Sequence, residues 1–304
     1  MRLGVLDVGS NTVHLLVVDA YRGGHPWPAA TDKTVLRLAE QLDAKGAITR
    51  AGADALVEAV GRARKVAEES EVEEMLAFAT SAVRDAVNGP AVLARVKAET
   101  GVHLSVLGGD DEARLTFLAA RRWFGWSAGR LLLLDIGGGS LELAAGRDEL
   151  PDAAMSVPLG AGRLTRNWAG DLDGLTAHVE ETLAPVTSVL KEEGWDRAAG
   201  TSKTFRTLAR LAGAAPSRAG LWAPRSLSLE GVHQVLGFIR RMPADALAEL
   251  DGVSPRRAHQ LVAGAVVAEV ALRQLGVERL DICPWALREG MILRWLDLAE
   301  TGAP

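Results

Sequence analysis

Short apolar runs that end in small or polar residues dominate the hydrophobic pattern of this 304-residue chain. Four successive leucines at 131–134 are followed by Asp135, three glycines and Ser140, and the apolar pattern then resumes at 141–143. A short apolar run bounded by turn residues is typical of a buried strand. The stretch 131–143 therefore predicts a strand, a tight glycine-rich turn and a returning strand.

Two kinds of chemistry suit this turn. Glycines leave room for backbone N–H groups to approach an anion closely, because no Cβ keeps the ligand away. Asp135 at the mouth of the turn could hold a divalent cation, either directly or through a water molecule. The alternative interpretation is an ordinary hairpin with no ligand.

A second copy of the pattern occurs near the N-terminus, at residues 5–18. The alignment of the two copies pairs Asp7 with Asp135, Gly9 with Gly137, and Thr12 with Ser140. Because an Asp is kept in both, the repeat favours a functional turn over an ordinary hairpin. It predicts two related domains that face each other across a cleft, with the boundary near 126–129.

The rest of the chain alternates between apolar runs and helical periodicity, which predicts an α/β fold. Helices are expected at 49–69, with Thr49 as N-cap, and at 90–100, 112–123, 175–193, 261–275 and 286–293. Further strands are expected at 34–38, 75–79, 103–107, within the strand and turn of 155–164, and at 280–283. In such a sheet, ligands collect at the carboxyl ends of parallel strands.

Several polar stretches follow predicted strands. Residues 80–86 form a hydroxyl-rich junction between a strand and a helix. In the next junction Asp110 and Asp111 suit helix capping, whereas we expect Glu112 to face the cleft. Residues 200–206 suit a phosphate loop and a plain helix start equally well. The Arg pairs within 237–241 and 254–259 are interpreted as solvated helix faces.

Composition narrows the function classes. Hydrophobic residues make up 48% and charged residues 24%, which supplies enough apolar material for two cores. No apolar run reaches the roughly 20 residues that span a bilayer, and the N-terminal residues do not resemble a signal peptide. The net charge of −5 argues against nucleic-acid binding driven by overall charge. The single cysteine, Cys283, excludes an intramolecular disulfide and suits the cytoplasm.

Motifs along nearly the whole chain carry a family resemblance. In chain order they are Asp7–Thr12, Ala79–Ala86, Glu112–Leu115, Asp135–Leu143, Gly160–Leu164, Gly200–Thr204 and Ala286–Gly290. In this order they resemble the exopolyphosphatase / guanosine pentaphosphate phosphohydrolase (Ppx/GppA) family. Such an ordered set is far more specific than any one motif alone.

The resemblance implies duplicated actin-like (ribonuclease H-like) domains, as in the acetate and sugar kinase/actin superfamily, with the active site in the interdomain cleft. We expect one domain at 1–127 and the other at 128–286, with a C-terminal helix at about 287–304 packing back on the first. The implied reaction is hydrolysis of the terminal phosphate of inorganic polyphosphate, or of the 5′ phosphate of guanosine pentaphosphate. Mg²⁺ or Mn²⁺ is the implied cofactor, and family members often depend on K⁺ as well.

The resemblance assigns the catalytic base to Glu112, and we expect Arg84 to neutralise the attacked phosphate. The predicted phosphate-binding residues are Gly9, Ser10, Asn11, Thr12, Thr80, Ser81, Gly137, Gly138, Gly139, Ser140, Lys203 and Thr204. The predicted metal ligands are Asp135, Asp7 and Glu142. A basic path for a long polyanion is expected from Lys33, Arg37, Arg163, Arg166 and Arg206.

The chain departs from the family pattern at two places. Lys203 stands where the family usually has glycine, and Cys283–Trp285 replaces a stretch that usually reads Ser-Asp-Gly. Two rival functions remain open: an ATP-using kinase of the same superfamily, and a non-catalytic sensor of polyphosphate or guanosine tetraphosphate. The expected partners are polyphosphate or guanosine pentaphosphate, without membrane or nucleic acid. A second copy of the chain in a homodimer stays open.

Overall fold

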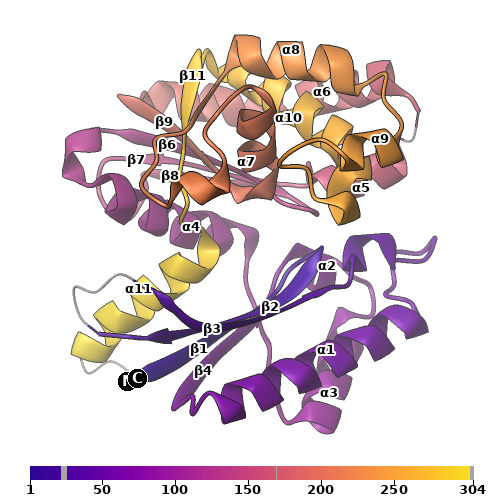
Figure 1. The fold of residues 1–304 in the computed structure, drawn as a ribbon, viewed down its shortest axis with the longest axis vertical. Coiled ribbons are helices and arrows are strands. Elements are labelled where there is room, and N and C mark those ends of the chain that lie inside the picture. The colour runs from indigo at the N-terminus through magenta and orange to yellow at the C-terminus, as the bar shows by residue number, and fades with distance from the viewer. Residues whose placement is uncertain (22–25, 169, 302–304) are drawn as a thin grey trace. The chain divides into compact units, whose positions relative to one another are not determined.

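The computed structural model describes residues 1–21, 26–168 and 170–301, and the chain divides into two compact units (Figure 1). The first unit combines Met1–Leu115 with the C-terminal stretch from Leu287, and the second is Thr116–Ala286. Helix α4 (Gly109–Phe124) contains the point of division, which precedes the expected boundary at 127/128. The expected C-terminal helix is α11 (Leu287–Thr301), and residues 302–304 lie outside the described part.

The first unit is built on a five-stranded sheet with the order β3-β2-β1-β4-β5. Its strands are β1 (Arg2–Val8), β2 (Thr12–Asp19), β3 (Pro28–Val35), β4 (Glu74–Ala79) and β5 (Ser105–Val106). Its helices, besides α4 and α11, are α1 (Arg50–Glu69), α2 (Ser81–Arg84), α3 (Gly89–Thr100) and the 3-10 turn η1 (Leu38–Glu40). Strands β1, β2 and β3 pair antiparallel, while β4 and β5 continue the sheet in parallel.

The second unit carries a six-stranded sheet with the order β10-β11-β9-β6-β7-β8. Its strands are β6 (Leu131–Ile136), β7 (Leu141–Gly146), β8 (Ala153–Val157), β9 (Arg197–Thr201), β10 (Ser226–Ser228) and β11 (Arg279–Ile282). Its α-helices are α5 (Ala161–Asn167), α6 (Leu172–Glu193), α7 (Ser202–Leu211), α8 (Leu229–Ile239), α9 (Ala244–Ala248) and α10 (Leu261–Leu275). Its 3-10 turns are η2 (Trp126–Ala128), η3 (Ser217–Ala219) and η4 (Pro255–Gln260).

Both sheets follow one topology, since β6, β7, β8, β9 and β11 repeat the connections of β1 to β5. The two hairpins also share a register: Asp7 lies opposite His14, and Asp135 lies opposite Glu142. The second sheet adds only the antiparallel edge strand β10. The predicted duplicated actin-like α/β fold is confirmed.

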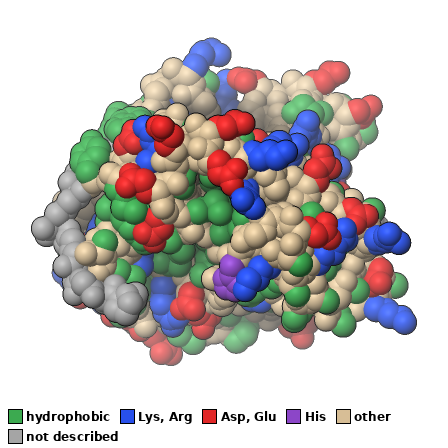
Figure 2. Space-filling model, turned by 90° about the horizontal axis from the view of Figure 1, so that it is seen from below, with side chains coloured by type: hydrophobic (Ala, Val, Ile, Leu, Met, Phe, Trp, Pro, Cys, Tyr) green, Lys and Arg blue, Asp and Glu red, His purple; other side chains and the backbone are tan. Residues whose placement is uncertain are grey.

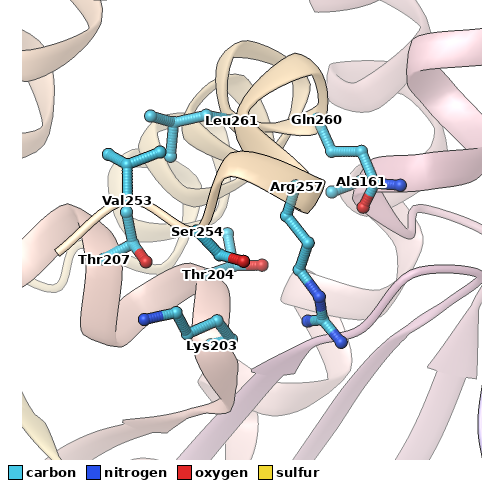
Figure 3. Close-up of a pocket in the computed structure, with 9 residues that line it drawn as sticks. All are labelled: Ala161, Lys203, Thr204, Thr207, Val253, Ser254, Arg257, Gln260 and Leu261. Atoms are coloured by element: carbon cyan, nitrogen blue, oxygen red, sulfur yellow. The ribbon is translucent and has the colours of Figure 1, made fainter. Parts of the chain in front are cut away.

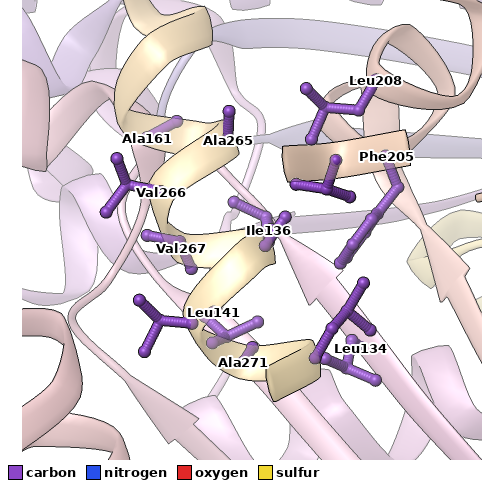
Figure 4. Packing of buried hydrophobic residues seen from close by; sticks show 14 of the residues in the cluster. Leu134, Ile136, Leu141, Ala161, Phe205, Leu208, Ala265, Val266, Val267 and Ala271 are labelled. Atoms are coloured by element: carbon purple, nitrogen blue, oxygen red, sulfur yellow. The ribbon is translucent and has the colours of Figure 1, made fainter. Parts of the chain in front are cut away.

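The central strands of both sheets are buried on both faces. In β1, Leu6 and Val8 join the core beneath α1, whereas Leu3 and Val5 join a second core with Ile292 of α11. In the second unit, side chains of β6 and β7 pack against α7 and α10 (Figure 4). Successive residues of a strand point to opposite faces of the sheet, and both faces are buried here. The strands therefore appear in the sequence as continuous apolar runs.

Some expected strands are shifted or shortened. The strand expected at 34–38 is β3, which ends at Val35 opposite the first residue of β2, and Arg37 beyond it adopts a left-handed conformation (φ 53°). The strand expected at 103–107 is reduced to Ser105–Val106. The Thr49 cap is confirmed, since its side chain accepts a hydrogen bond from the Gly52 N–H at 3.1 Å. Across the described ranges, none of the helices is long and apolar enough to cross a membrane.

Candidate active site

The two glycine-rich turns are closed by the same hydrogen bond. In the first, the Gly9 N–H donates to the Thr12 carbonyl at 2.9 Å, and in the second the Gly137 N–H donates to the Ser140 carbonyl, also at 2.9 Å. The turn itself therefore uses the first N–H of each loop. This bond does not involve the N–H groups of the three residues that follow in each loop, 10–12 and 138–140, which stay predicted phosphate-binding residues.

In the first unit, the turn lies against the junction between β4 and α2. The buried hydroxyls of Ser10 and Ser81 are 2.8 Å apart, and the Thr80 N–H donates to the Val8 carbonyl at 3.1 Å. The Asn11 carbonyl accepts from the N–H groups of residues 36 and 37, both at 3.0 Å. The structure thus brings these predicted phosphate-binding residues of the first unit together.

Arg84 and Glu112 form an ion pair in the first unit. The Arg84 Nη1 atom is 3.3 Å from the Glu112 Oε2 atom, and the side chains are 22% and 13% exposed. The same guanidinium contacts Asp85 at 3.1 Å and donates to the Leu107 carbonyl at 3.2 Å. Arg84 therefore orients the Glu112 carboxylate, and both side chains are largely buried. This arrangement suits a carboxylate that orients and deprotonates water.

In the second unit, Asp135 and Glu142 lie directly opposite each other on β6 and β7. Cross-strand partners project to the same face of the sheet, so both carboxylates lie on one face. Glu142 is 3% exposed and accepts a hydrogen bond from the Ser156 hydroxyl at 2.9 Å. Mg²⁺ binds through one or two carboxylates and keeps its other positions for water and substrate phosphates. The pair fits that ion, although no cluster of three or more His, Cys, Asp or Glu occurs among the described residues.

Asp7 has a different environment in the first unit. Its carboxylate lies 4.0 Å from the Arg288 guanidinium, which also contacts the imidazole of His14, Nε2 at 2.9 Å. Burial, together with the charges of Arg288 and Lys33, lowers the pKa of His14 to about 3. His14 is therefore a neutral hydrogen-bonding group at physiological pH.

The second glycine turn is held by the start of α5. The Arg163 Nε donates to the Gly139 carbonyl at 2.8 Å, and its backbone N–H donates to the Gly138 carbonyl at 3.0 Å. A Cβ atom on Gly160 would lie 2.3 Å from backbone atoms of Gly139. Gly160 therefore allows the start of α5 to contact the backbone of the glycine turn. Arg163 supports the turn through these hydrogen bonds and also carries a positive charge.

The stretch 200–206 is a helix start. The Ser202 hydroxyl accepts from the Phe205 N–H at 3.4 Å, and the Ser202 backbone is left-handed (φ 86°). Just before it, the Thr201 hydroxyl donates to the Trp285 carbonyl at 2.9 Å, and the Cys283 N–H donates to the Gly200 carbonyl at 2.9 Å. The departure at 283–285 thus packs against the strand end that begins α7.

Lys203 is half-buried on the first turn of α7. Its ammonium donates to the Gly252 carbonyl at 3.1 Å. Burial lowers its pKa from the usual value, and the charges of Arg206 and Arg257 lower the pKa further. Its neighbour Thr204 donates to the Ile136 carbonyl at 3.1 Å, which joins α7 to the strand leading into the second glycine turn.

The other residues of the expected basic path have varied surroundings. Lys33 lies opposite His14 on β3, and the Arg37 guanidinium is 3.7 Å from the Glu40 carboxylate. Arg166 donates to the Asn167 side chain at 3.4 Å, and Arg206 donates to the Ser202 carbonyl at 2.9 Å. Charges of both signs are mixed over the face in Figure 2. The basic path stays a prediction.

Three residues that had no predicted site role lie beside predicted site residues. His14 follows Asp7 at the same spacing as Glu142 follows Asp135, so the repeat could have identified His14 as the counterpart of Glu142. Arg288 lies within the family motif Ala286–Gly290, but the sequence analysis predicted no site role for it. Arg257 belongs to a pair interpreted as solvated, which is wrong for this member: Arg257 is half-buried in a pocket (Figure 3), whereas Arg256 is exposed.

The matching topology of the two sheets and their matched hairpins define the class of the protein: it has a duplicated, actin-like α/β fold. The family model of the Ppx/GppA phosphatase family matches residues 17–299. The chain belongs to this family.

Relatives agree with that assignment over the full length. Exopolyphosphatase 1 of Mycobacterium leprae is 57% identical over 99% of this chain and 91% of its own length. Exopolyphosphatase 1 of Mycobacterium tuberculosis is 57% identical over 99% of this chain and 90% of its own length.

Solved structures share the fold at lower identity. An exopolyphosphatase from Cytophaga hutchinsonii superposes with a TM-score of 0.88 at 24% identity, covering 100% of this chain and 99% of its own. The Aquifex aeolicus family member has a TM-score of 0.79 at 24% identity, covering 98% of both chains.

Proposed function

We propose that the protein is an exopolyphosphatase that hydrolyses the terminal phosphate of inorganic polyphosphate. The observation that carries the proposal is the 57% identity, over 99% of this chain, to proteins named Exopolyphosphatase 1. The geometry of Arg84 and Glu112 supports it, because the pair supplies a carboxylate for water beside a cation for phosphate.

The reaction consumes one water molecule and releases one orthophosphate, leaving a chain shorter by one unit. In our proposal Glu112 orients the water and takes its proton as the water oxygen bonds to the terminal phosphorus. Arg84 neutralises the oxygens of the attacked phosphate. Phosphoryl transfer depends mainly on such positioning and charge neutralisation rather than on covalent catalysis.

The glycine-rich turns serve as phosphate holders in this proposal. Residues 10–12 and 138–140 donate backbone N–H groups, and Thr80 and Ser81 add hydroxyls in the first unit. Asp135 and Glu142, with Asp7 from the matched hairpin, are the proposed ligands for Mg²⁺ or Mn²⁺. The ion would supply positive charge that offsets the charge of the phosphates. K⁺ is a further proposed activator, and the proposed compartment is the cytoplasm.

A panel of substrates tests the proposal against its rivals. Orthophosphate release is measured with Mg²⁺ and K⁺ on triphosphate, medium and long polyphosphate, ATP and guanosine pentaphosphate. The proposal expects the highest kcat/KM on polyphosphate. A higher value on guanosine pentaphosphate would assign the other activity of the family, and tight binding without release would establish a sensor.

A further inference from the structure

The hydroxyls of Ser10 and Ser81 form a buried pair in the first unit. Ser10 belongs to the first glycine turn and Ser81 begins α2, and their Oγ atoms are 2.8 Å apart although 71 positions separate the two residues in the sequence. The residues are only 5% and 2% exposed. Because a buried hydroxyl that loses its partner costs free energy, this bond ties the glycine turn to α2.

The number of protons in the pair limits what it can give to a ligand. Each serine hydroxyl carries one proton and can accept two hydrogen bonds. Whichever oxygen donates within the pair, its proton is used there, and one proton is left for an outside acceptor such as a phosphate oxygen. Ser10 and Ser81 therefore cannot act as two independent hydroxyl donors, and the pair functions as one unit.

Helix α2 carries the link on to Arg84. The helix has only four residues, so Ser81 and Arg84 lie about one helical turn apart. The Thr80 carbonyl accepts from the N–H groups of Val83 at 3.1 Å and Arg84 at 3.0 Å, and the side chains of Ala82 and Val83 are buried in the core beneath α1. A short turn that is bonded and packed in this way moves as one piece, so a shift of Ser81 displaces Arg84.

The segment that follows β5 holds the Arg84–Glu112 pair from another side. The Leu107 N–H donates to the Ala79 carbonyl at 3.0 Å, and the Leu107 carbonyl accepts from the Arg84 Nη1 atom at 3.2 Å. The Glu112 N–H donates to the Gly108 carbonyl at 2.9 Å. Arg84 is thus held by this segment and by α2, which the hydroxyl pair ties to the glycine turn.

We propose that Ser10 and Ser81 are positioning residues that couple the first glycine turn to Arg84 and, through Arg84, to Glu112. The inference rests on the proposed function and deepens it. It makes the position of a phosphate held by the turn, and that of the cation that neutralises it, depend on one buried hydrogen bond. Loss of either hydroxyl breaks this bond, so loss of both should cost little more than loss of one.

A double-mutant cycle tests the coupling. Ser10→Ala and Ser81→Ala should each lower kcat on polyphosphate about tenfold with KM nearly unchanged, and the double variant should lose no more than about threefold beyond either one. In an Arg84→Gln background the double substitution should cost less than about threefold, because its effect passes through Arg84. Losses that multiply in the double variant, that appear in KM, or that persist in full without Arg84 would overturn the inference.

Thr100→Val is the matched control for the cycle. It removes another buried hydroxyl of the same unit, which donates to the Val96 carbonyl at 2.6 Å on α3. This variant should lower Tm but leave kcat unchanged, because Thr100 has no contact with the glycine turn or α2. An equal fall of kcat in Thr100→Val and Ser10→Ala would show a general loss of stability and would refute the coupling.

Hydrogen exchange separates this inference from the proposed function, since it requires no turnover. Amide exchange of residues 81–86 is followed by mass spectrometry in wild type, Ser10→Ala and Thr100→Val. The coupling predicts exchange at least about threefold faster in Ser10→Ala and unchanged in Thr100→Val. If the wild type released no phosphate but this difference were present, the proposed function would fail and the coupling would stand. If the wild type were active but Ser10→Ala exchanged like wild type in this stretch, the coupling would be wrong.

Discussion

Replacing Gly160 with alanine should damage the second glycine turn through space alone. Gly160 has φ −72° and ψ 142°, a conformation that alanine adopts freely, so no backbone strain is involved. The new Cβ would lie 2.3 Å from Gly139 and 2.4 Å from the backbone nitrogen of Ser140. Ordinary contacts begin near 3.4 Å, so the turn or the start of α5 must move by about 1 Å.

The size of the effect follows from that displacement. Overpacking of this kind costs about 1–3 kcal/mol of unfolding free energy. A misplacement of about 1 Å in a positioning element lowers the rate about 100-fold. We therefore expect Gly160→Ala to remain folded with a lowered Tm and to lose about 100-fold in kcat/KM on polyphosphate.

The assay compares orthophosphate release and thermal unfolding with those of Gly237→Ala. Gly237 lies on α8 in the same unit, and a Cβ there meets nothing within 4 Å. That control should keep its activity and gain up to about 1 kcal/mol of stability from helix propensity. A Gly160→Ala enzyme with wild-type KM, kcat and Tm would refute the reasoning.

Two further predictions concern the first unit. A Cβ on Gly290 would lie 1.9 Å from the carbonyl oxygen of Leu115, so Gly290→Ala should push α11 from the helix that carries Glu112. Unfolding in urea should show a loss of about 1–3 kcal/mol together with a lower kcat, and an unchanged variant would contradict this close packing. His14 has a native pKa of about 3, so the unfolded chain binds a proton that the native state does not. Stability should therefore fall as pH falls from about 6.5 to 3, by at most about 5 kcal/mol and less because the ring is partly exposed. Urea unfolding of metal-free His14→Gln should show a shallower pH slope, and an equal slope would place the titration elsewhere.

The hairpins and the long helices could be predicted from the sequence because their signals are local. The leucines of β6 are buried on both faces, and α10 spans Leu261–Leu275 as its Ala/Val-rich pattern predicts. The matching of Asp7 with Asp135 gave the duplication before any contact was known. These features can be predicted because hydrophobic periodicity and an internal repeat are both visible in the sequence alone.

Other features depend on partners that lie far away in the sequence. Strand β3 is set by its pairing with β2, because its own residues are only partly buried. Arg257 lines the pocket because η4 packs against α5, α9 and α10, and an Arg pair does not reveal which member turns inward. Arg288 reaches His14 from the other end of the chain. Such contacts are tertiary, and no local pattern encodes them.

The release of orthophosphate from long polyphosphate by wild type and by Glu112→Gln is the most direct test of the central claim. The substrate is incubated with Mg²⁺ and K⁺, free phosphate is measured over time, and the remaining chain lengths are resolved on a gel. Asp110→Asn is the control, since this exposed acid begins the same helix. We predict orthophosphate as the small product, a loss of about 10²–10⁴-fold in Glu112→Gln, and near-normal rates in the control. A folded Glu112→Gln enzyme that releases phosphate at the wild-type rate would contradict the account.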